Sequence, residues 1–247
     1  MRVHRQFILS SLALAALLPV GAAHATGVSG QGTWETTLLP RDINGDGAVD
    51  AFYDTVLDVS WLADGAVIGV TTGGEASAWV ANLDVHGITG WRLPTMIDTG
   101  APGCDHSFAG GTDCGFNPQT ISQDGQTVFS EMAHLGFVSL GNKAYCLPGD
   151  SECMAPQPDW GLTNTGGFRN LYGTAYWLGL AFEPYPVDMV WTFDTQYGYQ
   201  NGFPQEWEGL SIAVHAGDVA AVPEPQTSAL LLLGVAGVLA TVRRPSV

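Results

Sequence analysis

The chain has 247 residues, of which 46% are hydrophobic and only 13% charged, and it contains 32 glycines and 14 prolines. This composition indicates a folded, loop-rich, strand-leaning protein and excludes a disordered acidic tail. Residues 26–222 hold four basic and 23 acidic residues, a net charge of −19. Because so negative a surface repels phosphate and sulfate groups, nucleic acid, anionic membranes and sulfated polymers are excluded as partners.

The N-terminus has the pattern of an export signal. Two arginines precede the apolar run 7–20, and a pattern of small residues ends at Ala25, as a signal peptidase requires. The apolar run is shorter than the ~20 residues that a membrane-spanning helix needs. We therefore predict a signal peptide over 1–25 and a single exported domain over 26–222.

The first elements predicted in this domain are short strands at 36–39 and 55–61, which are rich in β-branched and apolar residues. A helix is predicted next, because Thr72 and Glu75 have the spacing of a capping box. Its apolar face follows at helical spacing: Ala76, Trp79, Val80 and Leu83. We expect this helix to end near Gly87.

A second helix is predicted over 130–140, with Ser130 as its N-cap and Gly141 as its stop. Its inward residues are Met132, Leu135 and Leu140. Turn-forming residues dominate 145–170, which we expect to be a long irregular loop. Strands are then predicted at 175–179, 189–193 and 210–214. Short strands mixed with two helices predict an α+β fold.

The C-terminus combines a tripeptide, a short apolar stretch and a basic end. The tripeptide is Pro223, Glu224 and Pro225, and the apolar residues 228–242 precede two arginines. This order resembles the PEP-CTERM sorting signal of Gram-negative bacteria that make exopolysaccharide, a motif also found in some ice-binding proteins. The resemblance implies that 223–247 is a sorting signal with a short transmembrane helix. It also implies an exosortase-type enzyme as a partner and a location at the cell surface or in the extracellular matrix.

The exported segment carries a second resemblance, centred on the sequence Trp-Arg-Leu-Pro-Thr at 91–95. With the motifs at 58–64, 176–177 and 213–219, it is similar to the domain of unknown function found at the C-terminus of a bacterial collagen-like adhesin. This resemblance implies a lectin-like α+β fold, extracellular adhesion and contact with carbohydrate, without catalytic residues. The adhesin's relatives bind sulfated glycosaminoglycan through basic surfaces, which a domain of charge −19 cannot do.

Four cysteines in an exported chain predict disulfides. They are Cys104, Cys114, Cys146 and Cys153. We expect nearest neighbours to pair, because each intervening loop is rich in glycine, proline or aspartate and closes easily. A zinc site at Cys104, His106 and Cys114 is the alternative, but it offers only three ligands.

Residues 42–50 match the first nine positions of an EF-hand-type calcium loop. Side-chain oxygens are expected from Asp42, Asn44, Asp46 and Asp50, and a backbone carbonyl from Ala48. The twelfth position is Tyr53, so Asp54 must supply the last carboxylate from one position late. The alternative is an Asx-rich turn between two strands, which needs no metal.

Several aromatic residues lie among glycine, proline and polar residues, where a ring can stay partly exposed. They are Trp160, Tyr185, Tyr197, Tyr199 and Trp207. Exposed rings with few charges suit stacking on sugar rings, and we select Trp160, Tyr185 and Trp207 as candidate ligand-binding residues. The alternative is that these rings hold loops onto the core.

No catalytic motif is evident. The sequence lacks Gly-x-Ser-x-Gly, His-Glu-x-x-His and Cys-x-x-Cys, and the pair formed by Glu131 and His134 occurs once, so His134 is expected on a helix surface or satisfied in the core. We therefore predict a non-enzymatic surface or matrix protein for adhesion or association with exopolysaccharide in a biofilm. A self-associating envelope protein and an unrecognised extracellular hydrolase are the alternatives.

Overall fold

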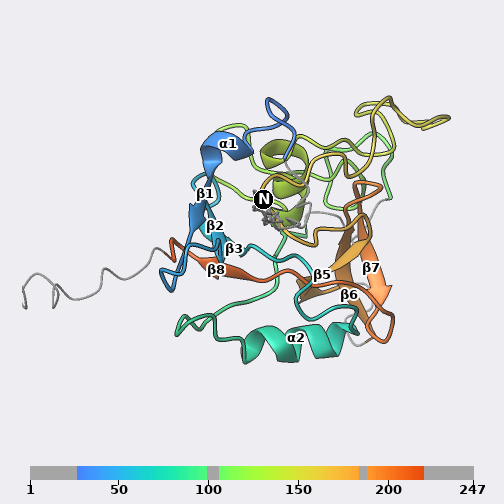
Figure 1. Ribbon diagram of the computed structural model, residues 1–247. Helices are drawn as coiled ribbons and strands as arrows, with labels where there is room; N and C mark the ends of the chain where they lie inside the picture. The colour runs from blue at the N-terminus through green and yellow to red at the C-terminus, as the bar shows by residue number, and fades with distance from the viewer. Residues whose placement is uncertain (1–26, 99–105, 184–187, 220–247) are drawn as a thin grey trace, which may run out of the picture.

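The computed structural model describes residues 27–98, 106–183 and 188–219 (Figure 1). The predicted signal peptide and the predicted sorting signal at Pro223, Glu224 and Pro225 lie outside these residues. Across the described part of the chain, no helix has the length and apolar character needed to cross a membrane.

In the described residues, eight strands form two antiparallel sheets, which lie on opposite sides of the molecule in Figure 1. The first sheet has the order β1-β2-β3-β8, with β1 at Leu38–Arg41, β2 at Ala51–Asp54, β3 at Val59–Leu62 and β8 at Val214–Ala216. The second has the order β4-β7-β6-β5, with β4 at Gly115–Phe116, β7 at Tyr199–Pro204, β6 at Met189–Asp194 and β5 at Ala175–Ala181. With the helices below, the predicted α+β class is confirmed.

The N-terminal strands differ from the prediction. Thr36 and Thr37 end the one-turn helix α1 (Trp34–Thr37), because both hydroxyls donate to the carbonyl of Thr33 and so close a turn. The predicted strand 55–61 begins instead with a tight turn. There the carboxylate of Asp54 accepts hydrogen bonds from the backbone N–H groups of Val56 and Leu57, so only the last part of the segment extends, as β3.

The first predicted helix is confirmed as α2 (Gly73–Ala81). Its capping box is present: the hydroxyl of Thr72 accepts from the N–H of Glu75, whose carboxylate accepts from the N–H of Thr72. The helix ends at Asn82, earlier than Gly87, because the amide of Asn82 donates to the carbonyl of Ala78 and closes the last turn.

The second predicted helix is present in altered form. The hydroxyl of Ser130 caps α3 (Glu131–Ala133) as expected, but the chain then widens into the π-helix η1 (His134–Ser139). The N–H of Leu140 donates to the carbonyl of Leu135, five residues back, which is the bond of a π-turn. Met132, Leu135 and Leu140 are buried as predicted.

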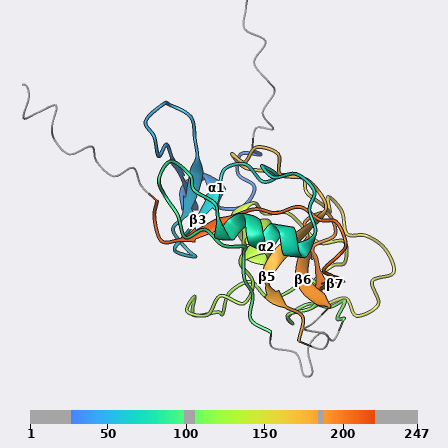
Figure 2. The same ribbon diagram turned by 90° about the horizontal axis from the view of Figure 1, so that it is seen from below.

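The main core lies between the two sheets and includes α3 and η1. Its largest fully buried side chains include Trp61, Trp191, Tyr176 and Phe193 from the two sheets and Phe168 from a connecting segment. A smaller core lies under α2, where Ala76 and Val80 meet Leu62 of β3 and Trp177 of β5, together with Trp91 and Ala213 from the connecting segments. Figure 2 shows α2 crossing the molecule in front of the strands. The outer face of the second sheet is therefore covered by α2 on the β5 side.

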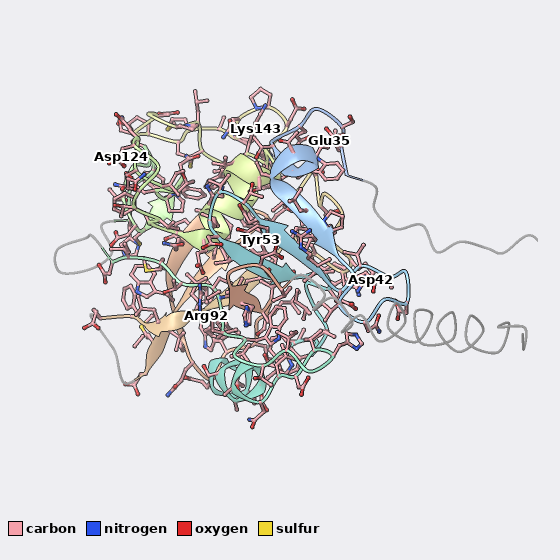
Figure 3. All side chains as sticks on the ribbon, turned by 90° about the vertical axis from the view of Figure 1, so that its left-hand side faces the viewer. Glu35, Asp42, Tyr53, Arg92, Asp124 and Lys143 are labelled. Carbon is pink, nitrogen blue, oxygen red and sulfur yellow. A yellow bond between two sulfur atoms is a disulfide. The ribbon has the colours of Figure 1, made fainter. Side chains whose placement is uncertain are left out.

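An ion pair fastens the segment 91–95 to α3. Both terminal nitrogens of Arg92 donate to the carboxylate of Glu131 at 2.7 Å, and the N–H of Thr95 donates to the same carboxylate. Glu131 is buried, and Arg92 lies below the first sheet in the view of Figure 3. The segment 91–95 therefore has a structural role, because the backbone of Arg92 also bonds to Val214 of β8 in both directions, so the segment ties α3 to the first sheet.

Candidate ligand-binding groove

A groove of about 330 Å³ opens on the outer face of the second sheet, within the usual size of ligand pockets. Its floor consists of Thr192 and Asp194 on β6 and of Tyr199 and Phe203 on β7. These residues share a face because Asp194 lies opposite Tyr199, and Thr192 lies opposite Asn201, in the antiparallel register. The groove thus occupies the part of the outer face of the second sheet that α2 does not cover.

One wall of the groove is the segment 106–116, which contributes His106, Phe108 and Phe116. This segment folds back on itself, because the N–H of Phe116 donates to the carbonyl of Ser107 at 2.9 Å. The close approach depends on Gly115, whose φ is +89° and where an added Cβ would overlap the Ser107 backbone.

The wall and floor contain a connected series of aromatic rings. The ring of Phe116 lies 4.8 Å from that of Tyr199 and 5.9 Å from that of Phe108. The ring of Tyr145 lies 6.2 Å from that of Phe116 and 6.0 Å from that of Tyr197, and Tyr197 stacks on Trp160 at 5.4 Å. Phe108 and Tyr197 remain 44% and 46% exposed. The series thus offers partly exposed apolar ring surface to solvent, which favours a ligand with flat apolar surfaces.

Few polar atoms reach the groove. One oxygen of Asp194 accepts from the N–H groups of Gln196 and Tyr197 at 2.8 and 3.0 Å. Its other oxygen makes no hydrogen bond to any described residue. The hydroxyl of Tyr199 lies 3.3 Å from Nδ1 of His106, and burial raises the pKa of Tyr199, so this hydroxyl stays protonated and can donate to a ligand.

The loop closed by the second cysteine pair braces the groove. Cys146 and Cys153 form a disulfide, as predicted, and the carbonyl of Cys146 accepts from the side-chain amide of Asn117. Cys114 is also disulfide-bonded, so it offers no thiolate to zinc. Its expected partner, Cys104, lies outside the described residues.

The three selected aromatic residues have different fates. Trp160 lies in the aromatic series, stacked on Tyr197 and edge-on to Tyr145. Trp207 is 54% exposed and contacts the ring of Phe203, which lines the groove. Tyr185 lies outside the described residues. Neither Trp160 nor Trp207 lines the groove itself, and its lining consists of residues that were not selected: His106, Phe108, Phe116, Thr192, Asp194, Tyr197, Tyr199 and Phe203.

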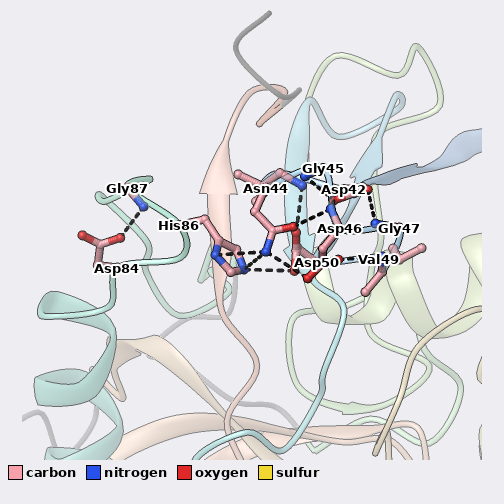
Figure 4. A network of polar contacts seen from close by, with 12 residues as sticks. Asp42, Asn44, Gly45, Asp46, Gly47, Val49, Asp50, Asp84, His86 and Gly87 are labelled. Carbon is pink, nitrogen blue, oxygen red and sulfur yellow. Dashed lines mark hydrogen bonds and ion pairs between the residues drawn. The ribbon is translucent and has the colours of Figure 1, made fainter. Parts of the chain in front are cut away.

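The candidate calcium loop lies elsewhere, between β1 and β2 (Figure 4). The carboxylate of Asp42 accepts from the N–H groups of Gly45, Asp46 and Gly47. The N–H of Ala48 donates to Asp46, the N–H of Ile43 donates to Asp50, and Asp50 also contacts His86 at 3.2 Å. Asn44 contacts both Asp46 and His86 through its amide nitrogen.

The structure brings Asp42, Asn44, Asp46, Ala48 and Asp50 together but not Asp54. Asp54 ends β2, at the opposite end of that strand from Asp50, and its buried carboxylate lies 3.4 Å from the hydroxyl of Ser139 in η1. Within the described ranges, no three histidine, cysteine or acidic side chains are grouped as a metal site. Calcium in this loop stays a prediction.

His134 is fully buried in η1, which agrees with a core position. It is not satisfied there, because neither ring nitrogen has a hydrogen-bond partner among the described residues. Burial lowers the pKa of His134, and the nearby carboxylate of Asp54 opposes this effect. Its spacing partner Glu131 binds Arg92 instead, so the two residues form no shared site.

No family model matches this chain, and neither a curated protein nor a solved structure shows significant similarity to it. The two resemblances stated from the sequence therefore stay predictions.

Proposed function

We propose that this is an exported, non-enzymatic protein of the cell surface or extracellular matrix, which binds polysaccharide through the aromatic groove. The observation that carries the proposal is the connected series of partly exposed rings on an open sheet face. Ring faces of this kind cover the C–H groups of sugars, while neighbouring polar groups bind hydroxyls. A lectin-like role of the α+β domain follows from this use of the groove.

The chemistry of the groove supports binding over cleavage. Among the described residues that line it, Asp194 is the single carboxylate, whereas glycoside hydrolysis ordinarily uses two carboxyl groups on either side of the scissile bond. The disulfide at Cys146 supports an oxidising location. In this proposal, the C-terminal signal brings the protein to the surface, and the groove attaches it to exopolysaccharide.

Self-association is a second candidate function. Leu147 lies inside the disulfide loop and Met154 follows it, and these apolar side chains are 53% and 86% exposed. Apolar side chains this exposed favour contact with a second copy of the chain.

A glycan array with the purified protein tests the proposal. The variant Tyr197→Ala removes an exposed ring of the groove, and Tyr172→Ala removes a ring that is 53% exposed and lines a separate hollow. We expect Tyr197→Ala to weaken binding about tenfold, because a lost ring contact is worth about 1 kcal/mol or more, and Tyr172→Ala to bind normally.

Unchanged glycan binding by Tyr197→Ala would contradict the assignment of the groove as the binding site. Concentration-dependent dimers without glycan binding would favour self-association, and turnover of an arrayed sugar would reveal a hydrolase.

A further inference from the structure

The groove carries a negative charge, which limits the classes of ligand that it can bind. Its lining combines five aromatic rings with one carboxylate: Phe108, Phe116, Tyr197, Tyr199, Phe203 and Asp194. Thr192 and His106 complete the lining, and Nδ1 of His106 lies 3.3 Å from the hydroxyl of Tyr199. The backbone N–H groups of Gln196 and Tyr197 hold one oxygen of Asp194. The carboxylate is therefore fixed in place, with its second oxygen left for a ligand.

No arginine or lysine of the described chain neutralises this carboxylate. Arg41 binds Asp218, Arg92 binds Glu131, and Arg169 donates to the carbonyl of Val49. Lys143 points to the carbonyl of Pro158 and to Asp159, and it lies near the top of the molecule in Figure 3. The groove therefore keeps a negative charge inside a domain that is itself strongly acidic.

Aromatic faces and a carboxylate together form the chemistry that attracts an organic cation. The ring faces carry negative electrostatic potential and attract ammonium groups within about 6 Å, and the fixed carboxylate adds a charge-assisted hydrogen bond. A carboxylated or sulfated sugar meets repulsion at the same place. The rings can stack on the C–H face of a cationic or an anionic sugar alike. The negative charge of the carboxylate therefore decides which of two sugars of similar shape binds.

We propose that the groove selects polysaccharides that carry free amino groups, such as polymers of de-acetylated hexosamine. This inference rests on the proposed function, because the sugar rings stack on the aromatic series while an ammonium group contacts Asp194. A hexosamine supplies both features in one unit: the C–H face covers an aromatic ring, and the amine projects from the ring edge. A neutral glycan uses only the stacking part of the groove.

Calorimetric titration of the purified full chain tests the inference with two probes of equal length, a glucosamine hexamer and its fully N-acetylated counterpart. The N-acetylated hexamer keeps the sugar ring and removes the charge. We expect the free-amine hexamer to bind about tenfold tighter, and we expect this preference to shrink as salt is raised, because salt screens the partly exposed pair.

The variant Asp194→Asn isolates the charge. Its amide oxygen can still accept from Gln196 and Tyr197, so the turn stays closed, while the negative charge is removed. We expect Asp194→Asn to lose the preference and to retain binding of the N-acetylated hexamer. Asp124→Asn serves as the matched control, because Asp124 lies in an exposed loop that is distant from Asp194 in sequence. This variant should behave as the parent protein.

The outcomes separate the two proposals. If the parent protein binds the N-acetylated hexamer as tightly as the free-amine hexamer, selection for amines is wrong and the proposed function stands. If neither hexamer nor any arrayed glycan binds, the proposed function fails and the inference fails with it. A lysine hexapeptide is the third probe. Equal binding of this peptide, lost in Asp194→Asn, would overturn the sugar assignment in favour of a basic protein partner.

Discussion

The loop 42–50 and the aromatic groove differ in whether their exposed side chains already have partners within the protein. In the loop, the carboxylates of Asp42, Asp46 and Asp50 accept hydrogen bonds from N–H groups of the same loop. In the groove, ring faces stay in contact with water, and one oxygen of Asp194 has no partner among the described residues. A loop whose polar groups are already hydrogen-bonded needs no ligand to be stable. Burial of exposed apolar rings by a ligand, in contrast, lowers the free energy.

The two regions also differ in how the chain assembles them. The loop is mostly local, since the hydrogen bonds from its backbone N–H groups to its aspartate side chains join residues at most seven apart, while His86 contacts Asn44 and Asp50 from outside the loop. The groove joins the consecutive strands β6 and β7 to the segment 106–116, which is far from them in sequence, and the Cys146–Cys153 loop braces it. Mutations at long-range contacts should therefore damage the groove and leave the loop intact.

The largest effect is expected from Gly115→Ala. The added methyl group would overlap the Ser107 backbone, and alanine is strained at a φ of +89°, so we expect a loss of about 2 to 5 kcal/mol in the free energy of unfolding. Glycan binding should be lost as well, because the wall that carries Phe108 and Phe116 moves. Urea unfolding and the glycan array measure the two effects.

Gly111→Ala is the matched control for this change. Its φ is +83°, but nothing lies within 4 Å of an added Cβ, so it should cost only about 1 to 2 kcal/mol from backbone strain. Equal stability of the two variants would show that the close approach of Gly115 to Ser107 contributes nothing.

A pH-dependent loss of stability is expected from His134, which is fully buried. Burial lowers the pKa of His134 below the ordinary value of 6.5. The unfolded chain therefore takes up a proton near pH 6.5 while the folded protein does not. Stability should be greatest above this pH and should fall as the pH drops, until the lowered folded pKa is reached.

The variant His134→Leu removes the titrating group and fills the same buried position. We expect it to lose most of the slope of unfolding free energy between pH 7 and pH 5, measured by urea unfolding. His86→Gln, at a partly exposed histidine, should keep that slope. A parent protein with flat stability over this range would refute the role of His134.

A smaller effect is expected from Asp42→Ala in the loop. Three N–H groups lose their acceptor, and bonds to a charged group contribute more than neutral ones, so we expect a loss of about 2 kcal/mol after water replaces part of them. Asp84→Ala, which removes the acceptor of one N–H group in a neighbouring loop (Figure 4), should cost less. Glycan binding should be unchanged in both variants.

Addition of calcium is expected to change the stability least, and it tests whether the loop is a metal site or only a turn. If the sequence-based prediction holds with the weak affinity of extracellular modules, 1 mM calcium should stabilise the protein by about 0.4 to 1.4 kcal/mol, and Asp46→Ala should abolish this gain. A melting temperature that does not respond to chelator would mean that the loop is an Asx-rich turn held by its own hydrogen bonds.

Local patterns in the sequence predicted local structure well. The spacing of Thr72 and Glu75 predicted the capping box of α2, Ser130 predicted the cap of α3, and the close cysteines predicted the 146–153 disulfide. The strand ends were predicted poorly, because bonds from Thr36 and Asp54 to nearby backbone groups outweighed β-propensity.

The groove was predicted only in part. Trp160, Tyr197 and Tyr199 were recognisable as aromatic residues in polar surroundings. Phe108, Phe116 and Asp194 were not, because their part in the groove depends on the pairing of β4, β6 and β7 and on how α2 divides the sheet face. The alternation of Tyr199 and Phe203 on β7 is the signal that indicates a shared face.

The most direct test of the central claim, that the groove and not the loop is the ligand-binding surface, is an NMR titration of the labelled protein with the free-amine hexamer. We expect ligand-dependent shifts in the ring signals of Tyr197, Tyr199 and Phe203, with the backbone signals of Gly45 and Gly47 unchanged. Shifts centred on the loop 42–50, with the groove rings unaffected, would contradict the account.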